Sequence, residues 1–355
     1  MGELELLSRS GNVELFRFVS DSTGAPEDLK RYISASIGYD TYLKYAISQN
    51  YWRLYCRESL EGHLADEICD RYFLAKVNGQ YAARMWYGWN KRTGRGNFGN
   101  VFTEPEFRHQ GLMNLLLPEL GRDFQRTSIR MMCCIARKDL GPIYNRIGLR
   151  YLYGESGVMC ASKDHSFAEE ERAAYSDLSR LNIRPGRSGD QFDCDKFLVY
   201  TSKIYGNPLQ YRIGPAAIIE DYRCAFMEKL SGNAVVNVLE TGKGDPAGYA
   251  FAVWKFPQAV MDFTIHPDAM KSEESCELLR KTSADLTVLN GKVPFVYVPC
   301  ANRPHIELLK KAGFLQCGGI PDQMDIFILQ GREGGPVRGE RAVSGELGVE
   351  IRSTV

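Results

Sequence analysis

The residues most suited to bind a ligand lie in a short turn. This turn joins a predicted strand, 100–103, to a predicted helix that begins near Gly111. The turn contains Arg108, two further residues and then the glycine. A glycine at this point lets an anion approach the main chain without a side chain in the way. The first N–H groups of the helix and its dipole favour negative charge at the same place. The spacing therefore predicts an anion-binding turn, and a pyrophosphate fits it best.

The elements that must hold this turn follow from the hydrophobic pattern around it. The helix after the turn carries leucines at helical spacing, namely Leu112, Leu115, Leu116 and Leu120. Pro118 inside this helix predicts a kink or an irregular first turn, because proline has no N–H to donate. We expect strands at 13–19, 71–77, 80–87, 100–103 and 129–136, and helices within 26–61 and at 140–147.

The second part of the chain repeats this order of elements, after a stretch with an acidic helical segment at 167–181. We expect helices at 215–229, 272–286 and 304–311, and strands at 234–239, 248–255, 259–266 and 295–299. Pro267 and Gly313 follow Pro105 and Gly148 by 162 and 165 residues. Two similar offsets across several elements indicate an internal duplication.

The strand, the Arg-x-x-Gly turn, the helix, the next strand and the short helix with Tyr144 and Gly148 resemble the GNAT N-acetyltransferase superfamily. The resemblance implies an α/β (α+β) fold of two tandem domains, each a mixed, mostly antiparallel sheet flanked by helices. It implies a catalytic acyl-CoA-binding domain at 1–153, a linker with a connecting helix at 154–205, and a degenerate GNAT-like domain at 206–330. A Gly-rich charged tail follows at 331–355.

The resemblance also implies acetyl-CoA or another acyl-CoA as the co-substrate. The family pattern at the turn is Gln or Arg, two residues, Gly, one residue, then Gly or Ala. Arg108 and Gly111 match it, whereas Met113 replaces the last small residue. The backbone around Phe102 and Thr103 would hold the acyl group and polarise its carbonyl. The implied CoA contacts are Phe102, Thr103, Arg108, His109, Gln110, Gly111, Leu112, Met113, Asn114 and Arg137, the last in place of the family's usual Asn.

Two side chains are candidates for proton transfer. In the family, the tyrosine at the position of Tyr144 often protonates the departing CoA thiolate, a task that suits a phenol that is neutral at pH 7. The alternative is a tyrosine that only packs on the sheet. Glu104 lies at the strand end, where a general base for the acceptor would be needed. The alternative is a solvated turn carboxylate.

Several residues near the Gly-rich loop at 91–96 have two interpretations. We expect Trp86, Tyr87 and Trp89 either to line an acceptor pocket or to form a covered edge of the sheet. Arg92 and Arg95 either steer an anionic acceptor or the CoA 3′-phosphate, or belong to a solvated loop.

The second half keeps the pattern of elements but not the chemistry of the first. Alignment of Pro267 with Pro105 places Met270 at the position of Arg108 and Glu273 at that of Gly111, with Glu274 next. Two carboxylates at a helix start oppose phosphate binding. Leu309 stands at the tyrosine position, so we expect a structural domain or one wall of the acceptor site.

Composition narrows the classes of partner. The chain has 355 residues, of which 44 are basic and 44 acidic, so its formal net charge is zero and we expect neither nucleic acid nor a membrane as partner. The ten cysteines lack metal-ligand spacing, which predicts free thiols in a reducing compartment and no metal. The N-terminus lacks the features of a signal peptide, and no apolar run reaches membrane-spanning length, so we expect a cytoplasmic protein.

Three functions remain open at this level. The first is an acyl-CoA-dependent N-acyltransferase, in which an amine of a small molecule or a peptide attacks the thioester directly. The second is a Fem-type aminoacyl transferase, which also pairs two GNAT folds but uses aminoacyl-tRNA. The third is a non-catalytic acyl-CoA-binding module. The anion-binding turn and the neutral charge favour the first.

Overall fold

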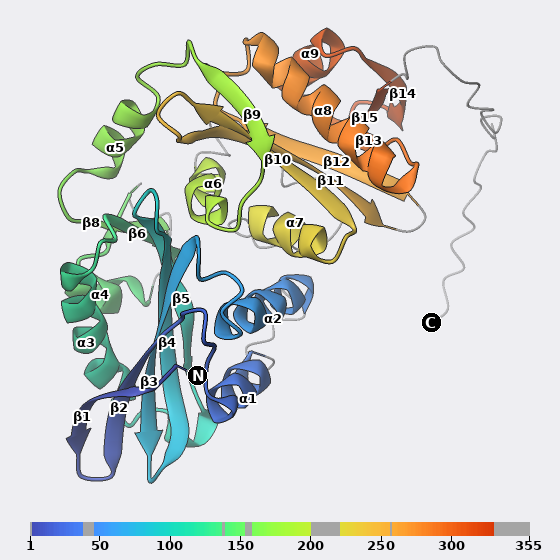
Figure 1. The fold of residues 1–355 in the computed structure, drawn as a ribbon. Helices are drawn as coiled ribbons and strands as arrows, with labels where there is room; N and C mark the ends of the chain where they lie inside the picture. Colours follow the sequence, from blue (N-terminus) through green and yellow to red (C-terminus); the bar gives the residue numbers. More distant parts are fainter. Residues whose placement is uncertain are drawn as a thin grey trace, which may run out of the picture.

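The computed structural model describes residues 2–37, 46–136, 139–152, 158–199, 221–255 and 258–329. These residues form two mixed, mostly antiparallel sheets with helices packed on them, so the predicted α+β fold is confirmed (Figure 1). The first sheet contains the strands up to residue 162, and the second contains the strands from residue 181.

The first sheet has the strand order β1-β2-β3-β4-β5-β6-β8-β7. Its strands are β1 (Glu5–Ser10), β2 (Val13–Val19), β3 (Ile68–Val77), β4 (Gln80–Asn90), β5 (Arg95–Thr103), β6 (Met131–Ile135), β7 (Arg150–Tyr151) and β8 (Val158–Ser162). All neighbours pair antiparallel except β5 and β6, which are parallel. Asn78 and Gly79, both with positive φ, form the predicted hairpin between β3 and β4.

Helices cover both faces of the first sheet, because its central strands alternate apolar side chains between two cores. In β3, Phe73 and Ala75 face the core under α3 (Leu112–Arg126) and the short α4 (Gly141–Tyr144). Tyr72 and Leu74 face the core under α1 (Glu27–Ser36) and α2 (Ala46–Leu60). Pro118 lies in the middle of α3, which runs unbroken past it, so the predicted irregular first turn is wrong.

The second sheet has the order β9-β10-β11-β12-β13-β15-β14. Its strands are β9 (Leu181–Pro185), β10 (Ala234–Thr241), β11 (Pro246–Lys255), β12 (Gln258–Ile265), β13 (Phe295–Pro299), β14 (Phe314–Ile320) and β15 (Met324–Leu329). The helices of this half are α6 (Asp190–Val199), α7 (Asp221–Leu230), α8 (Glu273–Asn290) and α9 (Arg303–Lys311). Upstream, the acidic helix α5 (Phe167–Ala174) ends before residue 181, which belongs to β9 instead.

The two sheets have the same topology once β1 is set aside. Strands β2 to β8 correspond in order and direction to β9 to β15, and the parallel pair β5/β6 corresponds to β12/β13. Two helices follow the first strand of each set, one long helix joins the parallel pair, and one short helix follows it. This shared order agrees with the repeat that the sequence indicates.

The two halves share one hydrophobic core. Helices α6 and α7 lie between the second sheet and α2 (Figure 1). Phe192 of α6 stacks on Trp86 of β4 with ring centroids 6.3 Å apart. Tyr222 and Phe226 of α7 join the same buried cluster as Tyr55 of α2. Burial of these aromatic rings stabilises both halves together.

Buried ion pairs add to this contact. Arg95 is only 4% exposed, and its Nη1 lies 3.3 Å from Asp193 and 2.9 Å from Asp245. Burial alone would lower the pKa of Arg95, but these two carboxylates more than offset it and raise the pKa. Arg92 lies 3.5 Å from Glu240. Both arginines therefore join the two halves. The prediction of a solvated loop is wrong for Arg95, whereas the Arg92 side chain is 38% exposed.

Candidate functional site

The first element of the candidate site is a gap between two parallel strands. Strands β5 and β6 pair only at Arg95 with Met131, Gly96 with Met132 and Asn97 with Cys133. Strand β5 then continues to Thr103 without β6 beside it. The backbone groups of this stretch that face β6 are open to a ligand that enters between the strands.

The second element is the turn that leads from β5 into α3. A short 3-10 helix, η2 (Pro105–Phe107), follows the strand, and then the backbone enters the left-handed region at His109 (φ 63°) and again at Gly111 (φ 76°). Within the described residues, the backbone N–H groups from His109 to Met113 have no hydrogen-bond acceptor. Nothing lies within 4 Å of a Cβ built on Gly111. Successive free N–H groups at a helix start form an anion-binding concavity.

The side chains of the turn are held away from this concavity. Arg108 Nε donates to the Thr103 carbonyl at 3.1 Å, and Gln110 Nε2 donates to the Glu106 carbonyl at 3.1 Å. Met113 packs against the core under α3, although the family pattern has a small residue there. The concavity is therefore built from main chain.

Asn114 has a partner that the sequence did not suggest. Its Oδ1 accepts from Arg146 Nη1 at 2.7 Å, across from the short η3 (Asn145–Ile147). This contact places an exposed guanidinium beside the first turn of α3, where a phosphate would bind. The available signal was the position of Arg146, two residues after Tyr144.

Tyr144 reaches the gap between the strands from the α4 side. Its side chain is 6% exposed, and its ring meets that of Phe98 edge-on, with centroids 5.0 Å apart. Phe98 directly follows the last paired residue of β5, Asn97. Tyr144 thus lies where the two strands begin to diverge.

Glu104 lies at the end of β5, partly buried, with its N–H donating to the Ala82 carbonyl at 2.9 Å. Burial, together with the carboxylate of Glu106, raises the pKa of Glu104. The charges of Arg84 and Arg108 oppose that rise. A carboxylate with a raised pKa is a stronger base, as a general base requires.

A third group of residues was not singled out from the sequence. The pairing of β4 with β5 shifts between Arg84 and Trp86, which forms a bulge opposite Met85. Asn100 in this bulge has a φ of 50°, and its Oδ1 accepts from Arg84 Nε at 2.8 Å. Arg84 is 3% exposed. The available signal was a lone arginine inside the apolar run of 82–89.

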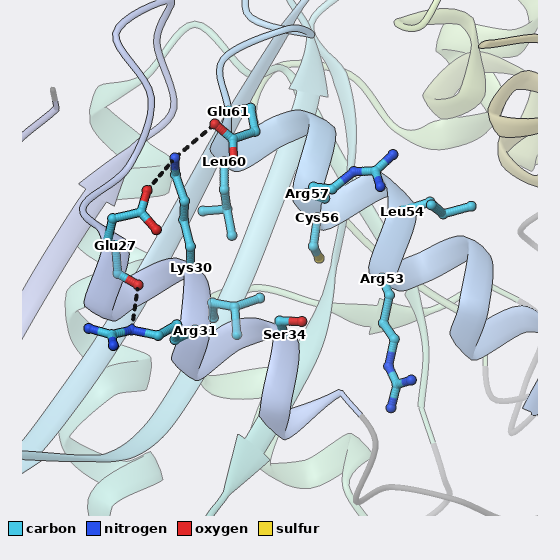
Figure 2. A pocket seen from close by; sticks show the side chains of 11 residues that line it. Glu27, Lys30, Arg31, Ser34, Arg53, Leu54, Cys56, Arg57, Leu60 and Glu61 are labelled. Atoms are coloured by element: carbon cyan, nitrogen blue, oxygen red, sulfur yellow. Dashed lines mark hydrogen bonds and ion pairs between the residues drawn. The ribbon is translucent and has the colours of Figure 1, made fainter. Parts of the chain in front are cut away.

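A pocket of about 590 Å³ opens between α1 and α2 (Figure 2). Lys30 reaches across to Glu27 and Glu61, at 3.0 and 2.8 Å, whereas Arg53 points away from these carboxylates. Cys56 lines the pocket from α2 and lies 4.0 Å from Asn100 Nδ2. The pocket therefore adjoins the bulge of β5.

The structure brings the predicted turn residues and Glu104 to the C-terminal end of β5, and it places Tyr144 beside Phe98 in the middle of that strand. Arg137 lies outside the described residues. The three aromatic residues of β4 do not line a pocket. Trp86, Tyr87 and Trp89 are at most 3% exposed, and they lie on a central strand, not at an edge. Trp86 Nε1 donates to the buried Asp70 at 2.8 Å, and the Tyr87 hydroxyl donates to Asp123. Both predicted interpretations of these residues are wrong.

The second half places a different turn at the equivalent point. Ser272, not Glu273, is the N-cap of α8 and corresponds to Gly111, so the aligned position shifts by one residue. The Ser272 Oγ accepts from the Ser275 N–H at 3.1 Å. Glu273 interacts with Arg280 at 2.5 Å, and this hydrogen bond lowers the pKa of Glu273.

Comparisons with known proteins gave similar solved structures. No family model and no curated protein matches this chain. It is similar to yncA of Salmonella typhimurium, solved with its cofactor acetyl-CoA, at 19% identity and a TM-score of 0.34, over 44% of this chain and 98% of that protein. It is also similar to a mutant of the spermidine N-acetyltransferase SpeG from Vibrio cholerae, at 16% identity and a TM-score of 0.32, over 42% and 94%.

Two further searches cover only the described residues. None of the helices there is long and apolar enough to cross a membrane. No group of three or more His, Cys, Asp or Glu side chains there is placed to hold a metal ion.

Proposed function

We propose that this protein is an acyl-CoA-dependent N-acyltransferase of the GNAT type, with acetyl-CoA as the donor and an amine of a small molecule or peptide as the acceptor. The observation that carries the proposal is the turn from His109 to Met113, whose free N–H groups adjoin the gap between β5 and β6. An anion site beside a strand gap fits a ligand with a pyrophosphate and an extended thioester arm.

The residues divide the chemistry among them. The N–H groups of His109 to Met113 bind the pyrophosphate, with Arg146 beside them, and the open backbone of β5 polarises the thioester carbonyl. Glu104 accepts the proton of the acceptor ammonium group, directly or through a water. The neutral amine then forms the C–N bond as the C–S bond breaks, and Tyr144 donates its proton to the leaving thiolate. The new amide nitrogen releases its remaining extra proton to solvent, and solvent returns a proton to Tyr144.

The proposal is tested by calorimetry and by an assay of CoA release. Acetyl-CoA should bind the full-length protein with a stoichiometry of one, because the turn before α3 is open and the equivalent turn before α8, also within the described residues, is capped by Ser272. A panel of amines, which includes spermidine and amino acids, should then reveal an acceptor through thiol release. A protein that binds no acyl-CoA would contradict the proposal. Acyl-CoA binding without turnover of any acceptor would favour a non-catalytic module, and transfer from aminoacyl-tRNA would favour a Fem-type enzyme.

A further inference from the structure

The guanidinium of Arg84 is buried, with the carboxylate of Glu104 near it but not paired with it. Its side chain is 97% buried by area, and within the described residues it forms no ion pair. Its Nε donates to Asn100, but its Nη1 has no hydrogen-bond partner. The hydroxyl of Tyr32, on α1, is also buried, and its contact with the Arg84 side chain is not a well-formed hydrogen bond. Native proteins rarely leave such groups unsatisfied, since each costs free energy when it is removed from water.

The surroundings of Arg84 are aromatic and mostly uncharged. Its guanidinium carbon lies 4.6 Å from the ring centroid of Phe102 and 6.0 Å from that of Tyr32. Burial raises the pKa of Tyr32 and that of Cys56 each to about 12, so both are neutral near pH 7. Glu104 is the carboxylate whose charge acts on both Arg84 and Tyr32. A positive charge in this setting attracts an anion strongly.

The pocket between α1 and α2 borders this cluster through Cys56. Cys56 lies in the pocket wall and 4.0 Å from Asn100, the residue that binds Arg84. The rim of the pocket carries more basic than acidic side chains, namely Lys30, Arg31, Arg53 and Arg57 against Glu27 and Glu61. Arg53 is exposed and forms no ion pair within the described residues. The rim is therefore basic as well.

We propose that Arg84 and Tyr32 bind a carboxylate of the acceptor, so that the amines acylated here are amino acids or other amines that carry a carboxylate. This inference rests on the proposed function. A carboxylate oxygen would accept from Arg84 Nη1 and from the Tyr32 hydroxyl, which satisfies both orphaned donors. The acceptor would then lie beside Glu104, the proposed base.

The first test uses the native protein and matched acceptors. Each of the twenty amino acids is compared with its primary amide, which keeps the amine and removes the negative charge. For the best acceptor, kcat/KM should be about 10- to 100-fold higher for the acid than for the amide, as expected for a charge-assisted hydrogen bond. Equal values for acid and amide, or a preference for spermidine, would overturn the inference while leaving the proposed function intact.

The second test uses variants and a binding readout. Arg84→Met should raise the ratio of KM for the acid to KM for the amide by about 10- to 100-fold. Tyr32→Phe should act in the same direction with a smaller effect, and Arg84→Lys should restore part of the loss. An equal loss with acid and amide would show that Arg84 only packs on Phe102.

A direct measurement separates this inference from the proposed function. The N-acetyl derivatives of the twenty amino acids are added one at a time without CoA, and at least one should raise the Tm of the native protein and raise that of the Tyr32→Phe variant less at the same concentration. This result would support the carboxylate site even if acetyl-CoA failed to bind, an outcome that would contradict only the proposed function. If Arg84→Met does not fold, the acid-to-amide ratio of the native protein and the Tyr32→Phe variant decide the matter.

Discussion

The turns before α3 and α8 occupy equivalent places relative to the two sheets. They differ in whether the helix start is capped by a side chain of the chain itself. Before α3, the N–H groups from His109 to Met113 have no acceptor in the described residues, and the space above Gly111 is open. Before α8, the hydroxyl of Ser272 caps the helix, and Ser275 Oγ donates to the Ala269 carbonyl at 2.7 Å. The N–H groups at the start of α3 are therefore free to bind a ligand, whereas the start of α8 is capped by its own serine side chain.

The strands around the two turns do not explain this difference. Strands β12 and β13 pair only at Val260 with Phe295 and Met261 with Val296, and then diverge just as β5 and β6 do. The gap is thus present in both halves. What changes is the residue type at one N-cap and the charge of the following turn, where Glu273 and Glu274 would repel a phosphate. The comparison predicts that the gap alone does not bind a ligand and that the residues of the turn decide whether one binds.

The largest effect is expected from a variant that places a carboxylate in the open turn before α3. Gly111→Glu should weaken acetyl-CoA binding on the order of 100-fold or more, because the new side chain and its charge occupy the anion site. Calorimetry on the full-length protein measures the effect. The matched control is Ser272→Asp, which places a carboxylate at the equivalent N-cap and should leave acetyl-CoA affinity unchanged.

A second control separates charge from backbone strain at Gly111. Its φ of 76° is costly for any residue with a Cβ, by about 1 kcal/mol. Gly111→Ala carries that strain without the charge, and the space around the new methyl group is empty. If Ala and Glu variants bind acetyl-CoA equally well, the turn is not the anion site.

The second prediction concerns Tyr144, the proposed proton donor, whose aligned position in the second half is Leu309. Tyr144→Phe keeps the ring that packs on Phe98 and removes only the hydroxyl. Turnover should fall by about 10²- to 10⁴-fold, with acetyl-CoA affinity nearly unchanged. The measurement is the rate of CoA release under conditions where the chemical step limits turnover. An unchanged rate there would make Tyr144 a packing residue.

The third prediction tests how firmly the two halves are joined. Arg95→Met leaves Asp193 buried without its cation, which should lower the free energy of unfolding by about 3–5 kcal/mol. The control is Arg92→Met, because the Arg92 side chain is 38% exposed and its pairs should contribute at most about 1 kcal/mol. Urea unfolding measures both. Similar small losses for the two variants would show that the buried pairs do not hold the halves together.

The sequence predicted the parts of this molecule whose signals are local. The apolar runs gave β2 to β6 and β10 to β13, but not β1, β7, β8, β9, β14 and β15. The leucine spacing gave α3, and the glycine after Arg108 marked the turn. The partners of Arg95 could not be predicted, because Asp193 and Asp245 stand about 100 and 150 residues further along the chain. The N-cap of α8 was misplaced by one residue, although Ser272 is a favoured N-cap type. The burial of Arg84 follows from the packing of α1 on the sheet, which no local pattern encodes.

The last and smallest prediction concerns the second half alone. His305 of α9 is 3% exposed and stacks near Phe263, and burial lowers its pKa to about 4. The unfolded chain binds a proton at this residue near pH 6.5, whereas the folded chain does so only near pH 4. Stability is therefore lost as the pH falls through this window, by up to about 3 kcal/mol.

The variant His305→Met isolates the contribution of His305 to the pH dependence of the free energy of unfolding, because other groups titrate equally in both proteins. The free energy of unfolding of the native protein should fall more steeply than that of the variant between pH 6.5 and 4. The first half offers no equivalent, since its histidines His63 and His109 are exposed. Parallel pH profiles for native and variant proteins would show that His305 is protonated in the folded state. A steeper native profile would mean that the half without an open turn limits the acid stability of the shared core.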